Sequence, residues 1–177
     1  MIYAKNKTAL LELKKDLDLV YNGAQVLEEK RNILLKEIVS VLDEIEDERI
    51  SLNHAVQKSY HTLIKAFMES GQVHLKKEAE LPIFNGKLHV YEKRFLGILI
   101  PKITYELKQV RFPLNISGET LFMEVARKSF IDATSSILAL AEIEFKAWRL
   151  VKELKKTVVR VNAMQKYYIP EYDKAIK

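Results

Sequence analysis

The fold is decided by residues 8–45, TALLELKKDLDLVYNGAQVLEEKRNILLKEIVSVLDEI. Apolar or small residues recur there at alternating steps of three and four: Leu10, Leu13, Leu17, Val20, Ala24, Leu27, then Leu34, Ile38, Val41 and Ile45. This spacing is typical of the heptad seam of a coiled coil. Arg31 interrupts the seam, and a charged residue there costs stability but can set the register. A helix with one apolar stripe needs a partner helix to bury that stripe.

A second long segment carries the same period and can serve as the partner. Its apolar positions are Ile137, Leu140, Ala147, Val151, Leu154, Val158, Val161 and Tyr168. A second apolar set near its start widens this face, and it consists of Leu138, Ala141, Phe145 and Trp148. The predicted seam of the helix pair therefore contains Leu10, Leu13, Leu17, Val20, Ala24 and Leu27 from the first segment, and Val151, Leu154, Val158 and Val161 from the second.

Glycine and proline cluster between the two long segments. Four of the five glycines (Gly71, Gly86, Gly97, Gly118) and three of the four prolines (Pro82, Pro101, Pro113) lie there. We expect one structural domain with an N-terminal long helix over residues 1–70, a tip region over residues 71–117 and a C-terminal long helix over residues 118–177. Since the middle is compact, the two long helices should run antiparallel.

The middle region also contains the strand signal of this chain. Residues 87–107 are rich in β-branched and aromatic side chains and predict a small β-hairpin, with Pro101 breaking the run. A short helix is expected over residues 72–81, and Ser117 is a plausible N-cap of the final helix. The predicted fold class is mainly α: a long antiparallel two-helix coiled coil with a small β-hairpin and a short helix at its tip.

Composition restricts the class of protein. The chain has 177 residues, of which 48% are hydrophobic and 30% charged, which is typical of a folded protein. It has no cysteine, so a disulfide framework and thiolate chemistry are excluded. The sequence contains no run of about 18 apolar residues and no signal-peptide pattern, so we expect no membrane insertion and a cytoplasmic location.

No catalytic constellation is found in the sequence. It lacks a P-loop, a GxGxxG and a GxSxG motif. His54, His61, His74 and His89 do not stand at metal-ligand spacing, and the acidic run from Asp43 to Glu48 is best interpreted as a solvated helix patch. We therefore predict a non-enzymatic chain without catalytic, cofactor-binding or metal-binding residues.

The positive charge is concentrated near the end of the chain. Residues 127–177 carry 11 Lys/Arg and 6 Asp/Glu, whereas the remaining residues carry 18 of each. Lys152, Lys155, Lys156 and Arg160 share one side of the predicted helix. Such a side can meet an acidic protein, an acidic lipid surface or nucleic acid, or be simply solvated. Nucleic acid is disfavoured because no aromatic residues interleave with these side chains as a stacking platform.

Pro170 lies inside a helical pattern and should kink or end the helix. Tyr167, Tyr168 and Tyr172 cluster around it. Tyrosines supply contact area and a polar tip, so this cluster suits either a subunit interface or packing at the helix end.

Several stretches, in order along the whole chain, resemble one family. Residues 6–17, NKTALLELKKDL, are followed by Gly23, Leu27, Lys30, Arg31 and Leu34, and residues 160–165, RVNAMQ, by Ile169 and Pro170. Residues 141–144, AEIE, and 98–101, ILIP, also fit. Together they resemble the D subunit of V/A-type rotary ATPases. The glycine at position 23 costs about 1 kcal/mol inside a helix, and we expect it to permit close approach of the second helix.

The resemblance implies a central rotor shaft that couples ATP hydrolysis or synthesis in a catalytic hexamer to proton or sodium transport. The implied partners are the catalytic and regulatory hexamer subunits, the stalk F subunit and the membrane-ring adaptor subunit, with no nucleic acid and no cofactor. Possible subunit contacts are Lys30, Arg31, Lys152, Lys156, Arg160 and Asn162. Family members usually continue beyond the Ile-Pro motif, so we expect a shaft whose upper end is short or outside this sequence. The alternative is a stand-alone coiled-coil adaptor without a rotary role.

Overall fold

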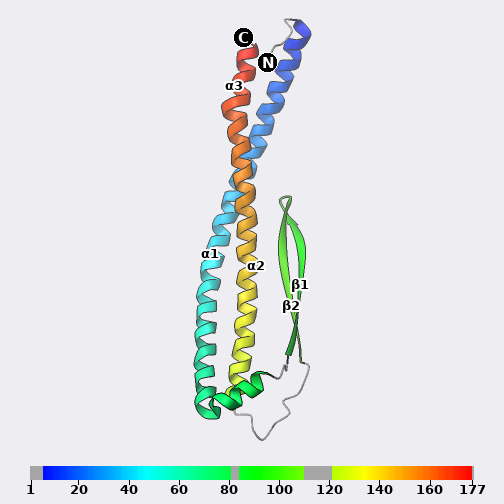
Figure 1. The fold of residues 1–177 in the computed structure, drawn as a ribbon. Helices are drawn as coiled ribbons and strands as arrows, with labels where there is room; N and C mark the ends of the chain where they lie inside the picture. Colours follow the sequence, from blue (N-terminus) through cyan, green and yellow to red (C-terminus); the bar gives the residue numbers. More distant parts are fainter. Residues whose placement is uncertain (1–5, 81–83, 110–120, 177) are drawn as a thin grey trace. The chain divides into compact units, whose positions relative to one another are not determined.

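The computed structural model describes residues 6–80, 84–109 and 121–176 (Figure 1). Helix α1 (Lys7–Ala79) is followed by strands β1 (Phe84–Phe95) and β2 (Ile98–Gln109) and by helix α2 (Leu121–Ala163). A π-helical turn, η1 (Met164–Tyr168), and helix α3 (Ile169–Ile176) end the described chain. The predicted fold class, mainly α with a long helix pair and a small β-hairpin, is confirmed. The proposed N-cap Ser117 lies outside the described residues.

The chain divides into two compact units. The first unit consists of residues 1–40 and 148–177, and the second unit consists of residues 41–147. Helices α1 and α2 each contribute to both units. In the described part of the chain, none of the helices combines the length and apolar character needed to cross a bilayer.

The first unit pairs the start of α1 with the end of α2 and with α3. Helix α1 begins at a cap, because Asn6 Oδ1 accepts a hydrogen bond of 2.7 Å from the Ala9 N–H. The fully buried side chains Leu34 and Leu150 anchor the pair. Around them the apolar side chains of Leu13, Ala24, Ile38 and Val161 are also buried. Leucine and other residues that are not branched at Cβ favour the helix, and burial of the apolar side chains against the partner helix supplies its stability.

The second unit packs its helices closely around small residues. Ala66, Ala126 and Ala133 are buried, and so are the hydroxyl side chains of Ser59 and Ser129. The Ser59 hydroxyl lies 2.8 Å from the Ser129 carbonyl oxygen on the opposite helix, so it satisfies its buried hydrogen-bonding capacity across the pair. Near the end of α1 the backbone leaves the helical region at Gly71 (φ 73°, ψ 163°), so residues 72–79 form a separate short helical segment, as the sequence predicts.

The β-hairpin differs in detail from the prediction. Its turn is at Leu96 and Gly97, both with positive φ (49° and 80°), which gives the type I′ geometry that suits the twist of two-residue hairpins. The prediction that Pro101 breaks the strand is wrong, because Pro101 lies inside β2 and pairs with Glu92. The hairpin lies beside α2, where the Ile103 N–H donates a hydrogen bond of 2.8 Å to Glu142 Oε2 (Figure 1).

Pro170 does not end the helix. The chain instead widens into the π turn of η1 directly before it, and the Ile169 N–H bonds to the Met164 carbonyl oxygen, five residues back. Helix α3 then continues through Pro170 to Ile176. The π turn thus accommodates a residue that lacks an N–H and would clash with the carbonyl four residues earlier.

Candidate interaction surfaces

The predicted seam residues lie on the helix pair at different depths. Leu13, Ala24 and Val161 are buried, and Leu17, Val20, Leu27, Leu154 and Val158 are half-buried. Leu10 and Val151 are exposed by 38% and 36%. In the second helix, Leu150 and Thr157 are fully buried instead of their neighbours Val151 and Val158. Two positions of the predicted seam are therefore shifted by one residue, whereas Leu140, Ala147 and Val161 are buried where the heptad places them.

A charge pair joins the two helices of the first unit. Lys30 Nζ lies 3.0 Å from Glu153 Oε1, and both side chains are less than one-third exposed. The hydrogen bond from Lys30 holds the pKa of Glu153 below its usual value, and the charges of Lys30, Lys156 and Arg160 act in the same direction against the effect of burial. Lys30, which the sequence suggests as a subunit contact, is thus engaged inside the chain.

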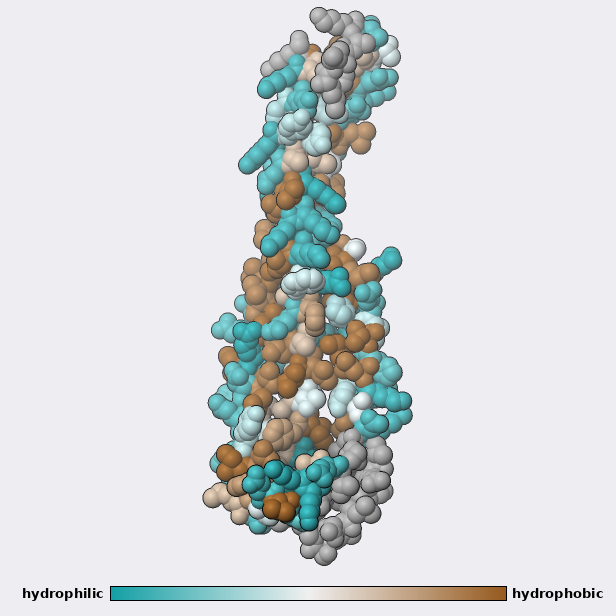
Figure 2. Space-filling model, viewed as in Figure 1, coloured by the Kyte–Doolittle hydropathy of each residue, from teal (hydrophilic) through white to brown (hydrophobic). Residues whose placement is uncertain are grey.

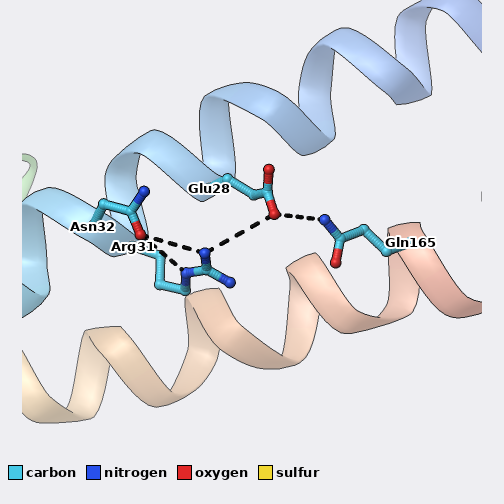
Figure 3. Close-up of polar contacts among 4 residues, drawn as sticks. All are labelled: Glu28, Arg31, Asn32 and Gln165. Carbon is cyan, nitrogen blue, oxygen red and sulfur yellow. Dashed lines mark hydrogen bonds and ion pairs between the residues drawn. The ribbon is translucent and has the colours of Figure 1, made fainter.

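A second polar contact crosses the same helix pair (Figure 3). Gln165 Nε2 donates a hydrogen bond of 2.6 Å to Glu28 Oε1. Arg31 lies beside them but stays on its own helix, with 3.3 Å to Asn32 Oδ1 and 3.9 Å to Glu28 Oε1. The cross-helix hydrogen bond in this region is therefore made by Glu28 and Gln165, whereas Arg31 holds Glu28 in place.

A shallow groove lies next to this contact. Its volume is about 450 Å³, and its lining residues are Tyr21, Ala24, Gln25, Glu28, Gln165 and Ile169. Gly23 lies near it, and a Cβ added at Gly23 would meet only Met164 Cε at 3.9 Å. The prediction that Gly23 allows close approach of the second helix is therefore wrong, since an alanine has ordinary van der Waals space at this position.

The tyrosine cluster reaches solvent near the same end of the unit. Tyr167 and Tyr168 stack edge to face with 5.3 Å between ring centroids, and they are 61% and 42% exposed. Tyr172 is half-buried on α3. Two adjacent exposed aromatic rings offer contact area to another protein.

The other predicted contacts lie on the exposed side of α2 in the first unit. Lys152, Lys156, Arg160 and Asn162 are all exposed. Lys152 Nζ lies 4.9 Å from the ring centroid of Trp148, whose side chain is 56% exposed. This cation–π contact was not predicted from the sequence, although the spacing of four residues places the two side chains on one face of the helix. Trp148 thus lies on the same exposed face as the basic side chain of Lys152.

Hydrophobic side chains also reach the surface of the second unit, where Figure 2 shows them among hydrophilic ones. Large examples are Tyr60, Ile64, Phe67 and Met68 on α1 and Leu121, Val125 and Phe130 on α2. Tyr60 and Phe130 form an edge-to-face pair with centroids 6.0 Å apart. Many exposed large apolar residues on one unit are typical of a chain that is covered by partners.

Charged residues of the second unit pair across the helices rather than gather into a metal site. Arg49 Nη2 lies 2.8 Å from Glu144 Oε1 on the opposite helix. Over residues 6–80, 84–109 and 121–176, no three histidine, aspartate or glutamate side chains are grouped so that they could hold a metal ion. The described residues form a helix pair that is joined by polar contacts and exposes charged, aromatic and apolar side chains.

Comparison with known proteins gives a consistent result. A family model that describes the D subunit of ATP synthase matches residues 9–177. The D subunit of a V-type ATP synthase from Thermotoga neapolitana is 29% identical, over 100% of this chain and 87% of the relative. The D subunit of an A-type ATP synthase from Pyrococcus furiosus is 30% identical, over 95% of this chain and 80% of the relative. Another, from Methanococcoides burtonii, is 29% identical over 96% and 84%.

Proposed function

Because the chain belongs to the family of ATP synthase D subunits, we propose that it is the central rotor shaft of a V/A-type rotary ATPase. In this role it couples ATP hydrolysis or synthesis in a hexamer of catalytic and regulatory subunits to proton or sodium transport. It contributes no catalytic group of its own and lies peripherally at the cytoplasmic side of the membrane, as part of the complex.

The observation that carries this proposal is that non-covalent contacts join the two long helices in both units. A shaft must transmit torque without one helix sliding along the other. Lys30 is paired with Glu153 in the first unit, and Arg49 with Glu144 in the second. The half-buried Lys30–Glu153 pair and the fully buried Leu34 and Leu150 resist sliding in the first unit. In the second unit the Arg49–Glu144 pair is exposed and adds little, and the buried hydrogen bond from Ser59 to Ser129 opposes sliding there.

The exposed side chains support turning inside a protein housing. Lys152, Lys156, Arg160 and Asn162 are solvated and carry charge or hydrogen-bonding groups, so they can form and break contacts at small cost. We propose these four residues as contacts to the hexamer. Lys30 and Arg31 act mainly within the chain, because each already has a partner there.

The partners follow from the same proposal. The stalk F subunit and the membrane-ring adaptor subunit bind the parts of the shaft outside the hexamer. Exposed apolar side chains of the second unit, such as Phe67 and Met68, suit permanent interfaces of this kind.

A cross-linking experiment tests the rotary role. The chain has no native cysteine, so a single cysteine can be placed at Val159, which is 67% exposed on α2. A second cysteine is introduced in a catalytic subunit, and the complex is assembled with the hexamer and the F subunit. Oxidation of the two cysteines to a disulfide should stop ATP hydrolysis, and reduction of the disulfide should restore it. The matched control carries the cysteine on the shaft alone.

Two results would contradict the proposal. One is a cross-linked complex that hydrolyses ATP at the rate of its reduced form, which would indicate a static adaptor. The other is a folded chain that does not co-purify with the hexamer or the F subunit.

A further inference from the structure

Among the described residues, the β-hairpin contacts α2 through the outer edge of β2 and, next to the turn, through Phe95, whose ring centroid lies 5.9 Å from Lys146 Nζ. On β2, the Ile103 N–H points away from β1 and donates to Glu142 Oε2, and Lys102 Nζ lies 3.5 Å from the other oxygen of Glu142. Ile103 is also half-buried, whereas residues 85–94 of β1 are all exposed. The edge of β2 is therefore occupied by α2, and the edge of β1 faces solvent.

The register shows which backbone groups of β1 point outward. Ile103 pairs with Val90, and an outward N–H on Ile103 makes this a non-hydrogen-bonded pair. Hydrogen-bonded and non-hydrogen-bonded pairs alternate along an antiparallel ladder. The outward N–H and C=O groups of β1 therefore belong to Gly86, Leu88, Val90, Glu92 and Arg94.

Two further features agree with this assignment. A two-residue turn at Leu96 and Gly97 places a hydrogen-bonded pair at Phe95 and Ile98, which gives the same alternation. Pro101 falls on a non-hydrogen-bonded position, where its missing N–H costs no ladder bond. The outer edge of β1 thus offers alternate hydrogen-bonding groups along an uninterrupted strand without proline.

The apolar face of the hairpin also continues past this edge. Leu88 and Val90 lie on the same face as their partners Tyr105 and Ile103. The two β2 side chains are half-buried, but Leu88 and Val90 are 52% and 59% exposed. A third strand on β1 would cover both residues and satisfy the outward backbone groups. A two-stranded hairpin gains most from such an addition, because it is only marginally stable alone.

The charge of β1 indicates which kind of segment could pair with its outer edge. Strand β1 carries three cations, Lys87, Lys93 and Arg94, against one carboxylate, Glu92. A second copy of β1 paired antiparallel about Val90 would place Lys87 opposite Lys93, so like charges disfavour self-pairing in that register. An extended segment with carboxylates and alternate apolar side chains would match both the charge and the apolar face.

We propose that the outer edge of β1 receives an extended acidic segment of another ATP synthase subunit as a third strand. The choice of partner rests on the proposed function. The strand geometry rests on the register, the contact to Glu142 and the exposed side chains of β1.

Hydrogen–deuterium exchange resolved to single amides tests this inference. The full chain is measured alone and assembled with the purified hexamer, F and membrane-ring adaptor subunits of the same organism. In the free chain, the outward amides of Leu88, Val90, Glu92 and Arg94 should exchange fast and the inward amides of His89, Tyr91 and Lys93 slowly. In the complex, the outward amides should slow by about tenfold or more.

Two variants separate the strand from a general contact. Val90→Pro removes one outward donor at a position where the hairpin ladder needs none, just as Pro101 does on β2. Val90→Ala keeps the donor and removes a comparable apolar area. Protection of Leu88 and Glu92 in the complex should be lost in Val90→Pro and largely kept in Val90→Ala, while the inward amides of both variants report an intact hairpin.

The results of these exchange measurements distinguish a failure of the third-strand proposal from a failure of the proposed rotor function. A complex that forms while the outward amides still exchange fast would overturn the third strand and leave the rotor proposal standing. Equal protection in Val90→Pro and Val90→Ala would also overturn it. If no complex forms with any of the subunits, both proposals fail together.

Discussion

Replacing Gly23 by alanine should stabilise the helix pair of the first unit. A glycine inside a helix costs about 1 kcal/mol relative to alanine, because it loses more backbone freedom on folding. The structure offers no compensation for this cost, since an added Cβ would meet only Met164 Cε, at 3.9 Å. The new methyl group therefore fits at ordinary contact distance. We expect Gly23→Ala to raise the free energy of unfolding by about 1 kcal/mol.

Urea unfolding followed by circular dichroism at the helix band measures this effect. The midpoint should rise with little change in the slope of the transition. The matched control is the reverse change at the next residue, Ala24→Gly, because Ala24 is only 5% exposed. This variant should lose about 1 kcal/mol of helix propensity plus the packing of a buried methyl. A Gly23→Ala protein that unfolds at lower urea would refute the reasoning and indicate that α2 needs the glycine.

The remaining predictions concern a charge pair, the core and the hairpin turn. The pKa of Glu153 is lowered in the folded chain by the hydrogen bond from Lys30, so its contribution to stability should be complete above about pH 5 and fade as the pH falls through the folded pKa. Glu153→Gln should remove this part of the acid dependence in unfolding curves recorded between about pH 6 and 3, and an unchanged dependence would contradict the assignment. Leu150→Ala should lower the free energy of unfolding by about 2–5 kcal/mol because the Leu150 side chain is fully buried, whereas Val151→Ala should lower it by less than about 1 kcal/mol. Equal losses of both variants in urea unfolding would contradict the burial of Leu150 in the seam. Leu96→Asn should stabilise the hairpin by about 1 kcal/mol, since a leucine with φ of 49° is strained and asparagine is favoured at such a position. The inward amides of β1 should then exchange more slowly with deuterium, and faster exchange would contradict the prediction.

The type of each long element and most of the helix seam could be predicted from the sequence, but two seam positions on α2 could not. The predicted Val161 is fully buried, but Leu150 and Thr157 take the places predicted for Val151 and Val158. Leu150 and Val151 are both apolar neighbours, so the sequence pattern does not decide which of them faces the partner helix. Thr157 also carries a hydroxyl that a hydropathy pattern counts against burial. In the structure this hydroxyl donates to the Glu153 carbonyl oxygen at 3.0 Å, so its polar group is satisfied within its own helix.

The hairpin shows a similar limit. Its residue types predict two strands, but the position of the turn depends on backbone conformations that the sequence signals only weakly. The turn residues are Leu96 and Gly97 and not the usual Asn-Gly pair, and leucine rarely adopts a positive φ. The sequence therefore gives no clear signal for a turn at this position. Pro101 is a strong local signal for a break, and its actual position became clear only from the pairing register. The outward edge of β1 is likewise a property of register and of one contact to Glu142, and not of composition.

Pro170, which predicts a kink or an end of the helix, is accompanied in the structure by a π turn and not by an end. The prediction rests on two local effects of proline inside an α-helix, namely the missing N–H donor and the clash of the ring with the carbonyl four residues earlier. It does not include the option of a π turn, in which the Ile169 N–H reaches back five residues to Met164 and the helix continues. This option is stabilised by contacts that are distant in sequence, such as Gln165 with Glu28. The π turn at Met164 and the pairing of Pro101 with Glu92 therefore let both prolines lie inside regular elements, although each is a local signal for a break.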